Sequence, residues 1–183
     1  VFCSHPPVVT LGRSSKKSDL LGWQGDVVTV TRGGKATYHG PNQLIIYPIL
    51  NLTSNDRKTL RSRDVHQYLR LLEEVIVESL IKLSVPAEVR TTEQVDDDGK
   101  KVLLTGVWVG SKKIASLGIA VKSWISYHGV AINLDRDEKA FQGINPCGFA
   151  SNIMTSVEEV LGKKVDRNEL INIVKENLLK KFL

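Results

Sequence analysis

Apolar residues recur at helical spacing over residues 65–83, and this is the clearest pattern along the chain. The positions that repeat every three or four residues are Leu69, Leu72, Val75, Ile76, Leu80 and Leu83. This spacing predicts an amphipathic helix, and Pro86 lies beyond its end. The last third predicts a short helix over residues 154–161, closed by Gly162. A second helix begins at Asp166, where Glu169 completes an arrangement like a capping box.

The other segments show the alternation and the β-branched residues of strands. Residues 27–30 and 44–47 predict two strands, and the polar, glycine-rich residues 32–41 between them predict a loop of the kind that carries sites. Residues 107–115 predict a hairpin that turns at Gly110, and residues 96–99 predict an exposed acidic turn. The alternation continues over 115–121 and 125–134, with a change of parity at Gly129 that indicates a bulge or a close backbone approach. Strands, one helix, more strands and then helices predict an α+β domain.

Composition and charge narrow the class of protein. The chain has 183 residues, of which 42% are hydrophobic and 25% charged, which is typical of one soluble globular domain. No apolar run approaches the roughly 20 residues that span a bilayer, and no signal peptide is visible. The formal net charge of +5 favours an acidic partner without choosing between protein, nucleic acid and membrane. Two cysteines far apart in sequence indicate reduced thiols.

A few residues could carry chemistry. Cys147 lies between Pro146 and Gly148 before a predicted helix, whose dipole would favour a thiolate, although a cysteine in a turn more often has a structural role. His39 and His128 each stand in a Tyr-His-Gly triplet, as possible bases or as packed histidines. The Arg32-Gly33-Gly34 segment could hold an anion, or be only a turn. Metal and nucleotide triphosphate sites are disfavoured because their motifs are absent.

Four blocks of the sequence, taken together, are more specific than any single residue. They are residues 5–13, 32–43, 106–119 and 127–148, which include Arg32-Gly33-Gly34-Lys35-Ala36-Thr37-Tyr38-His39-Gly40-Pro41 and Asn145-Pro146-Cys147-Gly148. In content and order they resemble the octanoyltransferases of lipoate biosynthesis. The resemblance implies an α/β fold like that of biotin and lipoate ligase catalytic domains. It also implies that residues 1–183 form one catalytic domain without the family's opening segment.

The resemblance further implies a reaction and a site. Cys147 matches the family's nucleophile and Lys113 its lysine. A Cys/Lys pair would take an octanoyl group from acyl carrier protein as a thioester and pass it to a lysine of a lipoyl domain or of glycine-cleavage H protein. The segments that match the family's substrate-binding residues are Arg32, Gly33, Gly34, Lys35, Ala36, Thr37, Tyr38, His39, Ser116, Leu117, Gly118, Gly129, Val130 and Ala131. Backbone amides near Leu117, Gly118 or Cys147 are candidate oxyanion donors.

The expected partners follow from the same resemblance. The donor is octanoyl-acyl carrier protein, and the acceptors are lipoyl domains of 2-oxoacid dehydrogenases and the H protein. No cofactor, metal, nucleic acid or membrane is expected, and the expected compartment is the cytoplasm, with the mitochondrial matrix as the alternative. The main rival function is an ATP-dependent lipoate or biotin ligase of the same fold, which has no nucleophilic cysteine at the position of Cys147. A non-catalytic RNA-binding domain is the rival from another class, and it would rest on the net charge alone.

Overall fold

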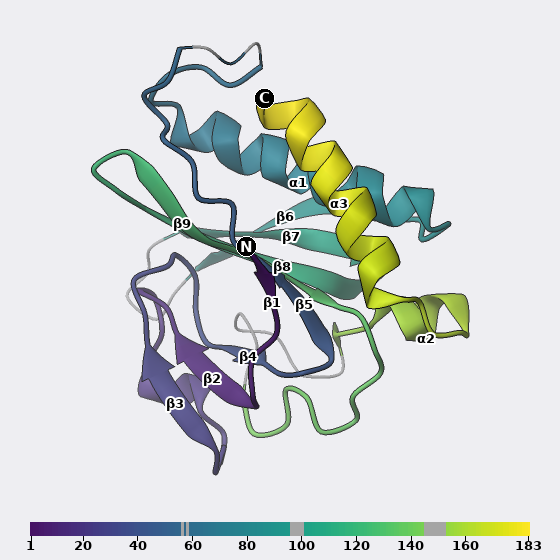
Figure 1. Cartoon of the computed structure of the whole chain (residues 1–183). Helices are drawn as coiled ribbons and strands as arrows, with labels where there is room; N and C mark the ends of the chain where they lie inside the picture. Colours follow the sequence, from purple (N-terminus) through teal and green to yellow (C-terminus); the bar gives the residue numbers. More distant parts are fainter. Residues whose placement is uncertain (56, 58, 96–100, 145–152) are drawn as a thin grey trace.

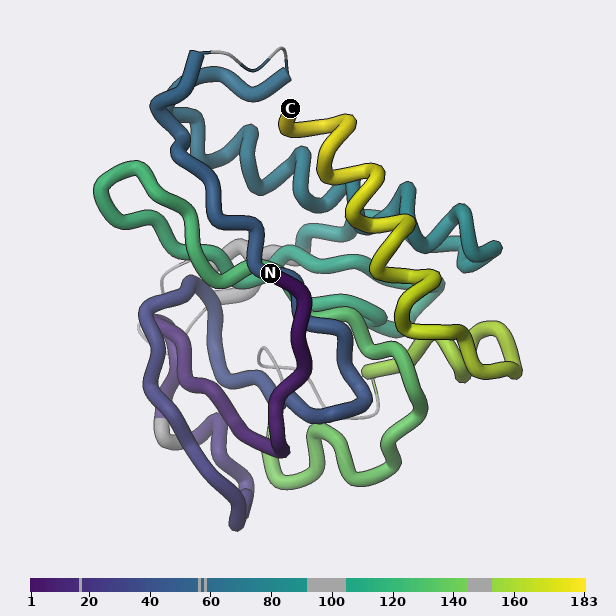
Figure 2. Tube along the Cα trace, in the orientation of Figure 1, coloured from purple at the N-terminus to yellow at the C-terminus, as the bar shows by residue number. Residues whose placement is uncertain are grey.

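A six-stranded antiparallel sheet runs through the middle of the protein in the computed structural model shown in Figure 1. The structure describes residues 1–183 except 56, 58, 96–100 and 145–152, so the predicted turn at 96–99 lies outside the described residues. In spatial order the strands are β1 (Phe2–Cys3), β5 (Gln43–Ile46), β9 (Ile125–Asn133), β8 (Lys112–Lys122), β7 (Lys101–Val109) and β6 (Glu88–Val95). Figure 2 shows the N-terminal strand beside residues 43–46, which lie far from it in sequence.

Two long helices cover one face of this sheet (Figure 1). The first, α1 (Val65–Lys82), confirms the predicted helix, and the Asp64 side chain caps it by accepting a hydrogen bond from the Gln67 backbone N–H. The other, α3 (Arg167–Phe182), begins at the Asp166 cap as predicted and packs against α1. Apolar residues from both helices and from the sheet form the main core. The predicted α+β class is therefore confirmed.

A three-stranded sheet lies on the side of the large sheet away from these helices (Figure 1). It consists of β3 (Asp26–Thr29), β2 (Val8–Leu11) and β4 (Thr37–His39), and a 3₁₀ turn, η1 (Lys17–Asp19), joins β2 to β3. Strand β4 corrects the prediction of a loop over residues 32–41. That segment consists mainly of glycines and polar residues, which suggested a loop. Ala36 and Tyr38, however, are buried with Val9 and Phe141 in a second apolar cluster. Burial of these side chains outweighs the weak local strand signal.

The short helix α2 (Val157–Leu161) begins later than predicted. Ser156 is its N-cap, and Ser156 and Glu159 form a reciprocal capping box, so the helix does not start at Met154. Gly162 closes it in a left-handed conformation, with φ of 66°, as expected. Met154 instead forms a parallel bridge with Lys113.

Strands β7 and β8 form the predicted hairpin, and a register shift lies between Val107 and Trp108. Beyond the Gly106–Ser116 pair, the described ladder between the two strands ends, although β8 continues to Lys122. The Gly33 N–H donates a hydrogen bond to the Ile119 carbonyl there, at 3.1 Å. None of the helices in the described ranges is both long and apolar enough to cross a membrane.

The prediction at Gly129 is confirmed as a close backbone approach. A Cβ atom on this glycine would lie 2.2 Å from the Ile46 carbonyl oxygen and 2.8 Å from Cδ of Pro48. His128 before it has φ of 59°, which side chains rarely adopt, while the pairing of β8 with β9 continues without a shift. The close approach lets β5 reach β9 beside His128.

Candidate active site

A cavity of about 480 Å³ lies among the large sheet, the small sheet and the first turns of α1. Its volume falls in the roughly 300–1,000 Å³ range of small-molecule sites. Most of the predicted site residues line it: Lys113, Arg32, Gly33, Gly34, Thr37, His39, Ser116, Leu117, Gly118, Gly129, Val130 and Ala131. These residues come from three separate segments of the chain, and the fold brings them together around one space.

Three of the predicted substrate-binding residues do not line this cavity. Ala36 is fully buried in the second apolar cluster, and Lys35 contributes its backbone carbonyl to Arg32. Tyr38 packs against Phe141 and donates a hydrogen bond from its hydroxyl to Asp137 at 3.3 Å. Burial, together with the charge of Asp137, raises the pKa of Tyr38 to about 12. The side chains of Ala36 and Tyr38 therefore hold the small sheet beside the cavity, and Lys35 contributes through its backbone.

Lys113 lines the cavity with a buried side chain, of which 2% of the surface is exposed. Its cross-strand partner is Trp108, but its side chain runs along β7 over Gly106 to the Thr105 carbonyl, to which Nζ donates at 3.4 Å. A Cβ atom at Gly106 would lie 2.4 Å from Cε of Lys113 and 3.0 Å from its Nζ. The missing side chain at Gly106 thus provides the space for the lysine.

Cys147 lies outside the described residues, so its position is not part of this geometry. The described residues on either side of its segment are anchored. Ile144 is buried and bridges to Leu20 in antiparallel fashion. On the other side, the Thr155 N–H donates to the Lys113 carbonyl at 3.0 Å, next to the bridge between Met154 and Lys113. The chain that follows Cys147 therefore returns to the backbone of Lys113.

Arg32 fixes the loop that closes one side of the cavity. Its Nη1 donates to the carbonyls of Gly33 and Lys35 at 3.0 and 2.8 Å, and its Nη2 donates to the carbonyl and hydroxyl of Thr10 at 2.9 and 2.8 Å. Gly118 leaves room for this side chain, because a Cβ there would lie 2.8 Å from Cδ of Arg32. Of the two interpretations of Arg32-Gly33-Gly34, these bonds favour a fixed turn over an open anion site.

Histidines and a tyrosine form a polar wall of the same cavity. His5 Nε2 and the Tyr47 hydroxyl lie 2.7 Å apart, and the rings of His5 and His39 meet edge to face. Burial and the charge of Arg32 lower the pKa of His39 to about 4, and the same two causes, in that order, lower the pKa of His128. Both imidazoles are therefore neutral at physiological pH.

The neighbouring amide fixes which nitrogen of His39 carries the proton. The Gln43 NH₂ group donates to the side-chain oxygen of Asn133 at 2.8 Å and to the Tyr38 carbonyl at 3.3 Å. The amide oxygen of Gln43 is thereby turned to Nδ1 of His39, 3.2 Å away, so Nδ1 carries the hydrogen and Nε2 is the free acceptor.

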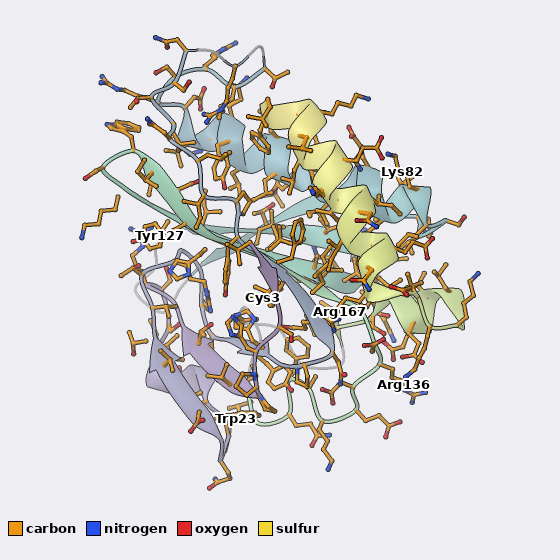
Figure 3. The ribbon with its side chains drawn as sticks, viewed as in Figure 1. Cys3, Trp23, Lys82, Tyr127, Arg136 and Arg167 are labelled. Atoms are coloured by element: carbon orange, nitrogen blue, oxygen red, sulfur yellow. The ribbon has the colours of Figure 1, made fainter. Side chains whose placement is uncertain are left out.

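Sequence reasoning missed several residues that line the cavity. They are His5, Val8, Thr10, Arg13, Val28, Val30, Ile45, Tyr47, Val65, His66, Leu69, Thr105 and Ile119. Most are isolated apolar or hydroxyl side chains with no local motif, and only the tertiary fold assembles them. His128, a possible base from its Tyr-His-Gly triplet, also lines the cavity. Its neighbour Tyr127, labelled in Figure 3, lies where β9 meets the small sheet, with its hydroxyl 2.9 Å from that of Thr31.

The assembled site combines apolar walls, the buried Lys113 side chain and neutral imidazoles. Apolar walls with a few polar groups suit a small ligand that carries a hydrocarbon chain. Among the residues that the structure describes, no group of three or more His, Cys, Asp and Glu side chains is arranged to hold a metal ion.

Comparison with known proteins identifies relatives of the chain. The family model described as "Lipoyl protein ligase A/B catalytic domain" matches residues 1–179. An octanoyltransferase of Bdellovibrio bacteriovorus is 48% identical over 180 residues, which cover 98% of this chain and 82% of that relative. An octanoyltransferase of Orientia tsutsugamushi is 40% identical over 183 residues, which cover 97% of this chain and 81% of that relative.

Solved structures share the fold at lower identity. A putative lipoate protein ligase of Thermoplasma acidophilum with bound lipoic acid superposes with a TM-score of 0.74 at 19% identity, covering 98% of this chain and 70% of that one. A biotin protein ligase of Aquifex aeolicus in complex with biotin and ATP superposes with a TM-score of 0.54 at 16% identity, covering 95% and 69% of the two chains. These two likenesses concern the fold.

Proposed function

The chain belongs to the lipoyl protein ligase A/B catalytic family, among its octanoyltransferases, and we propose that it transfers octanoyl groups through a thioester on Cys147. It is an acyltransferase of lipoate biosynthesis. Beyond this activity, we propose the thioester intermediate, octanoyl-acyl carrier protein as the donor, and a role for Lys113 in proton transfer. The observation that carries it is the burial of Lys113 on a cavity lined by the segments that match the family's substrate-binding residues.

The first half-reaction loads the enzyme. Cys147 begins as a thiolate paired with the Lys113 ammonium, and its sulfur attacks the carbonyl of octanoyl-acyl carrier protein. A new sulfur–carbon bond forms, and the bond to the carrier's phosphopantetheine sulfur breaks. The departing thiolate takes the proton of the Lys113 ammonium, leaving octanoyl-Cys147 beside a neutral amine.

The second half-reaction delivers the acyl group. The neutral amine of the acceptor lysine attacks the octanoyl-Cys147 carbonyl, an amide bond forms, and the Cys147 thiolate departs. The proton lost by the attacking nitrogen passes to Lys113, so the starting ion pair is restored. The acyl group arrives activated as a thioester, and the cycle balances without nucleotide.

The geometry around Lys113 supports this assignment. The Thr155 N–H binds the Lys113 carbonyl, so the chain eight residues after Cys147 is attached to the strand that carries the lysine. Apolar side chains such as Val30, Leu117 and Val130 line the cavity and provide contacts for a hydrocarbon chain. Each methylene buried there contributes about 0.8 kcal/mol.

The partners belong to the same proposal. The donor is octanoyl-acyl carrier protein, and the acceptors are the lipoyl domains of 2-oxoacid dehydrogenases and the glycine-cleavage H protein. A solved lipoate protein ligase of the same fold has been described together with its E2 lipoyl domain. The net charge of +5 suits acidic partners. We place the reaction in the cytoplasm, with the mitochondrial matrix as the alternative.

A transfer assay tests the proposal against the ligase alternative. The purified chain is given a lipoyl domain with either octanoyl-acyl carrier protein and no nucleotide, or free octanoate with ATP. We expect octanoyl-lysine only in the first mixture, and its loss in Cys147→Ser. Transfer from free octanoate that requires ATP and survives Cys147→Ser would replace the proposal with a ligase.

A further inference from the structure

Glu73 is a buried carboxylate on the inward face of α1, with 1% of its surface exposed. The neighbouring inward positions on this helix, Leu72, Val75 and Ile76, are apolar and belong to the main core. Burying a carboxylate costs free energy unless it is paired and hydrogen-bonded, and a packed apolar side chain is often no less stable at such a position. The burial of this carboxylate must therefore be explained by the groups that it contacts.

The bonds of Glu73 lead to the strand below it. Its Oε1 accepts a hydrogen bond from the Thr105 hydroxyl of β7, and its Oε2 lies 2.7 Å from Nη1 of Arg70. Arg70 is half exposed and also donates to the Thr91 hydroxyl at 3.3 Å. The arrangement joins α1 to β6 and β7 through polar groups at the edge of an apolar core.

Thr105 connects this network to the cavity. Its hydroxyl donates to Glu73, while its backbone carbonyl accepts from Nζ of Lys113 at 3.4 Å. Thr105 and Lys113 both line the cavity, and Gly106, the next residue, gives the lysine its space. One carboxylate thus holds the residue whose carbonyl receives the buried ammonium.

We propose that Glu73 is a positioning residue for Lys113, acting through Thr105. By binding the Thr105 hydroxyl it fixes the carbonyl that receives the ammonium, and it places a negative charge on the helix side of β7. This inference rests on the proposed function for its consequence in catalysis, because Lys113 is the proton carrier there.

Chemical labelling of Lys113 tests the inference without any octanoyl transfer. Trace acetic anhydride is added to the folded chain, and acetylation at Lys113 is compared by mass spectrometry with that at Lys112, its exposed neighbour. Losing a hydrogen bond of about 1 kcal/mol corresponds to about fivefold, so Glu73→Leu and Thr105→Val should each raise the Lys113-to-Lys112 ratio about fivefold. Glu73→Gln, whose amide oxygen still accepts from Thr105, should recover most of the difference.

Glu74→Gln is the matched control, because this carboxylate is the next residue on α1 but pairs with Lys181 of α3 at 2.8 Å. It should leave the labelling ratio at the wild-type value. Thermal unfolding checks that each variant is folded. If Glu73→Leu does not fold, the labelling ratio of Thr105→Val alone tests the inference. A wild-type ratio in both folded variants, or in Thr105→Val alone, would overturn the inference.

The catalytic consequence is measured separately. Glu73→Leu should lower kcat for octanoyl transfer while the KM for the donor stays within about twofold, since Glu73 acts on the lysine and does not line the cavity. Absence of octanoyl transfer in the wild-type chain would count against the proposed function only. The labelling ratio would still decide whether Glu73 positions Lys113.

Discussion

Cε of Lys113 lies over the backbone of Gly106, 2.4 Å from where a Cβ atom of that residue would be. Gly106→Ala should therefore displace the lysine side chain, because its far end is flexible while the β7 backbone is not. We expect octanoyl transfer to fall by about tenfold or more, since misplacing a reacting group by about 1 Å costs up to 100-fold. Steady-state kinetics measures the loss of octanoyl transfer, and thermal unfolding measures any loss of stability.

Gly110→Ala is the control for this change. Gly110 has φ of 56° in the hairpin turn, with nothing within 4 Å of an added Cβ. Alanine there should cost about 1 kcal/mol of stability through backbone strain but leave transfer unchanged. Full activity in Gly106→Ala would show that the position of Lys113 over this glycine does not matter.

The low pKa of His39 predicts a loss of stability in acid. The imidazole has a pKa of about 4 in the folded protein, against 6.5 for an ordinary histidine. As the pH falls below 6.5 the unfolded chain takes up a proton that the folded chain does not. The free energy of unfolding therefore drops between pH 6.5 and 4, by about 3 kcal/mol at the lower limit.

Urea unfolding of the wild type and of His39→Gln, at pH 7 and at pH 4.5, isolates this contribution from that of the carboxylates. The variant should lose less stability than the wild type on acidification, because position 39 no longer titrates. Its neighbours Arg32, His5 and His128, which also lower the pKa of His39, remain in place. Equal losses in the two proteins would contradict the assignment of this titration to His39.

The apolar walls of the cavity predict how kcat/KM depends on the length of the acyl chain. With about 0.8 kcal/mol for each buried methylene, kcat/KM should rise about fourfold per methylene from butanoyl to octanoyl donors. Ala131 lines the cavity and is 4% exposed, so Ala131→Leu should shorten the preferred chain by one or two carbons. A uniform loss for all donors would instead indicate that Ala131 does not face the acyl chain.

The elements with strong periodicity could be predicted from sequence alone. The apolar stripe that contains Leu72 and Ile76 identified α1, and the alternation around Leu117 identified β8, because each pattern follows directly from one buried face. Strand β4 was missed because the glycines at 33 and 34 suggested a loop, and only the burial of Tyr38 against Phe141 reveals the strand. The start of α2 was predicted too early because Ser156, and not an earlier residue, is the N-cap of this helix.

The residues of the site also differ in whether they could be predicted from sequence. Lys113 was identified by its resemblance to a family, and the structure adds the reason why it fits, which is the bare backbone of Gly106. Glu73 and Thr105 could not be predicted as partners, because they are 32 residues apart and meet only when α1 packs on β7. The role of Cys147 stays a prediction.

The most direct test of the thioester mechanism is intact mass spectrometry after incubation with octanoyl-acyl carrier protein and no acceptor. Cys3 is the internal control, because burial raises the pKa of its thiol and makes it a poor nucleophile. The thioester mechanism predicts one octanoyl-sized mass increase that hydroxylamine removes, that persists in Cys3→Ala and that is absent from Cys147→Ala. No adduct in the wild type, or an adduct that persists in Cys147→Ala, would contradict the thioester mechanism.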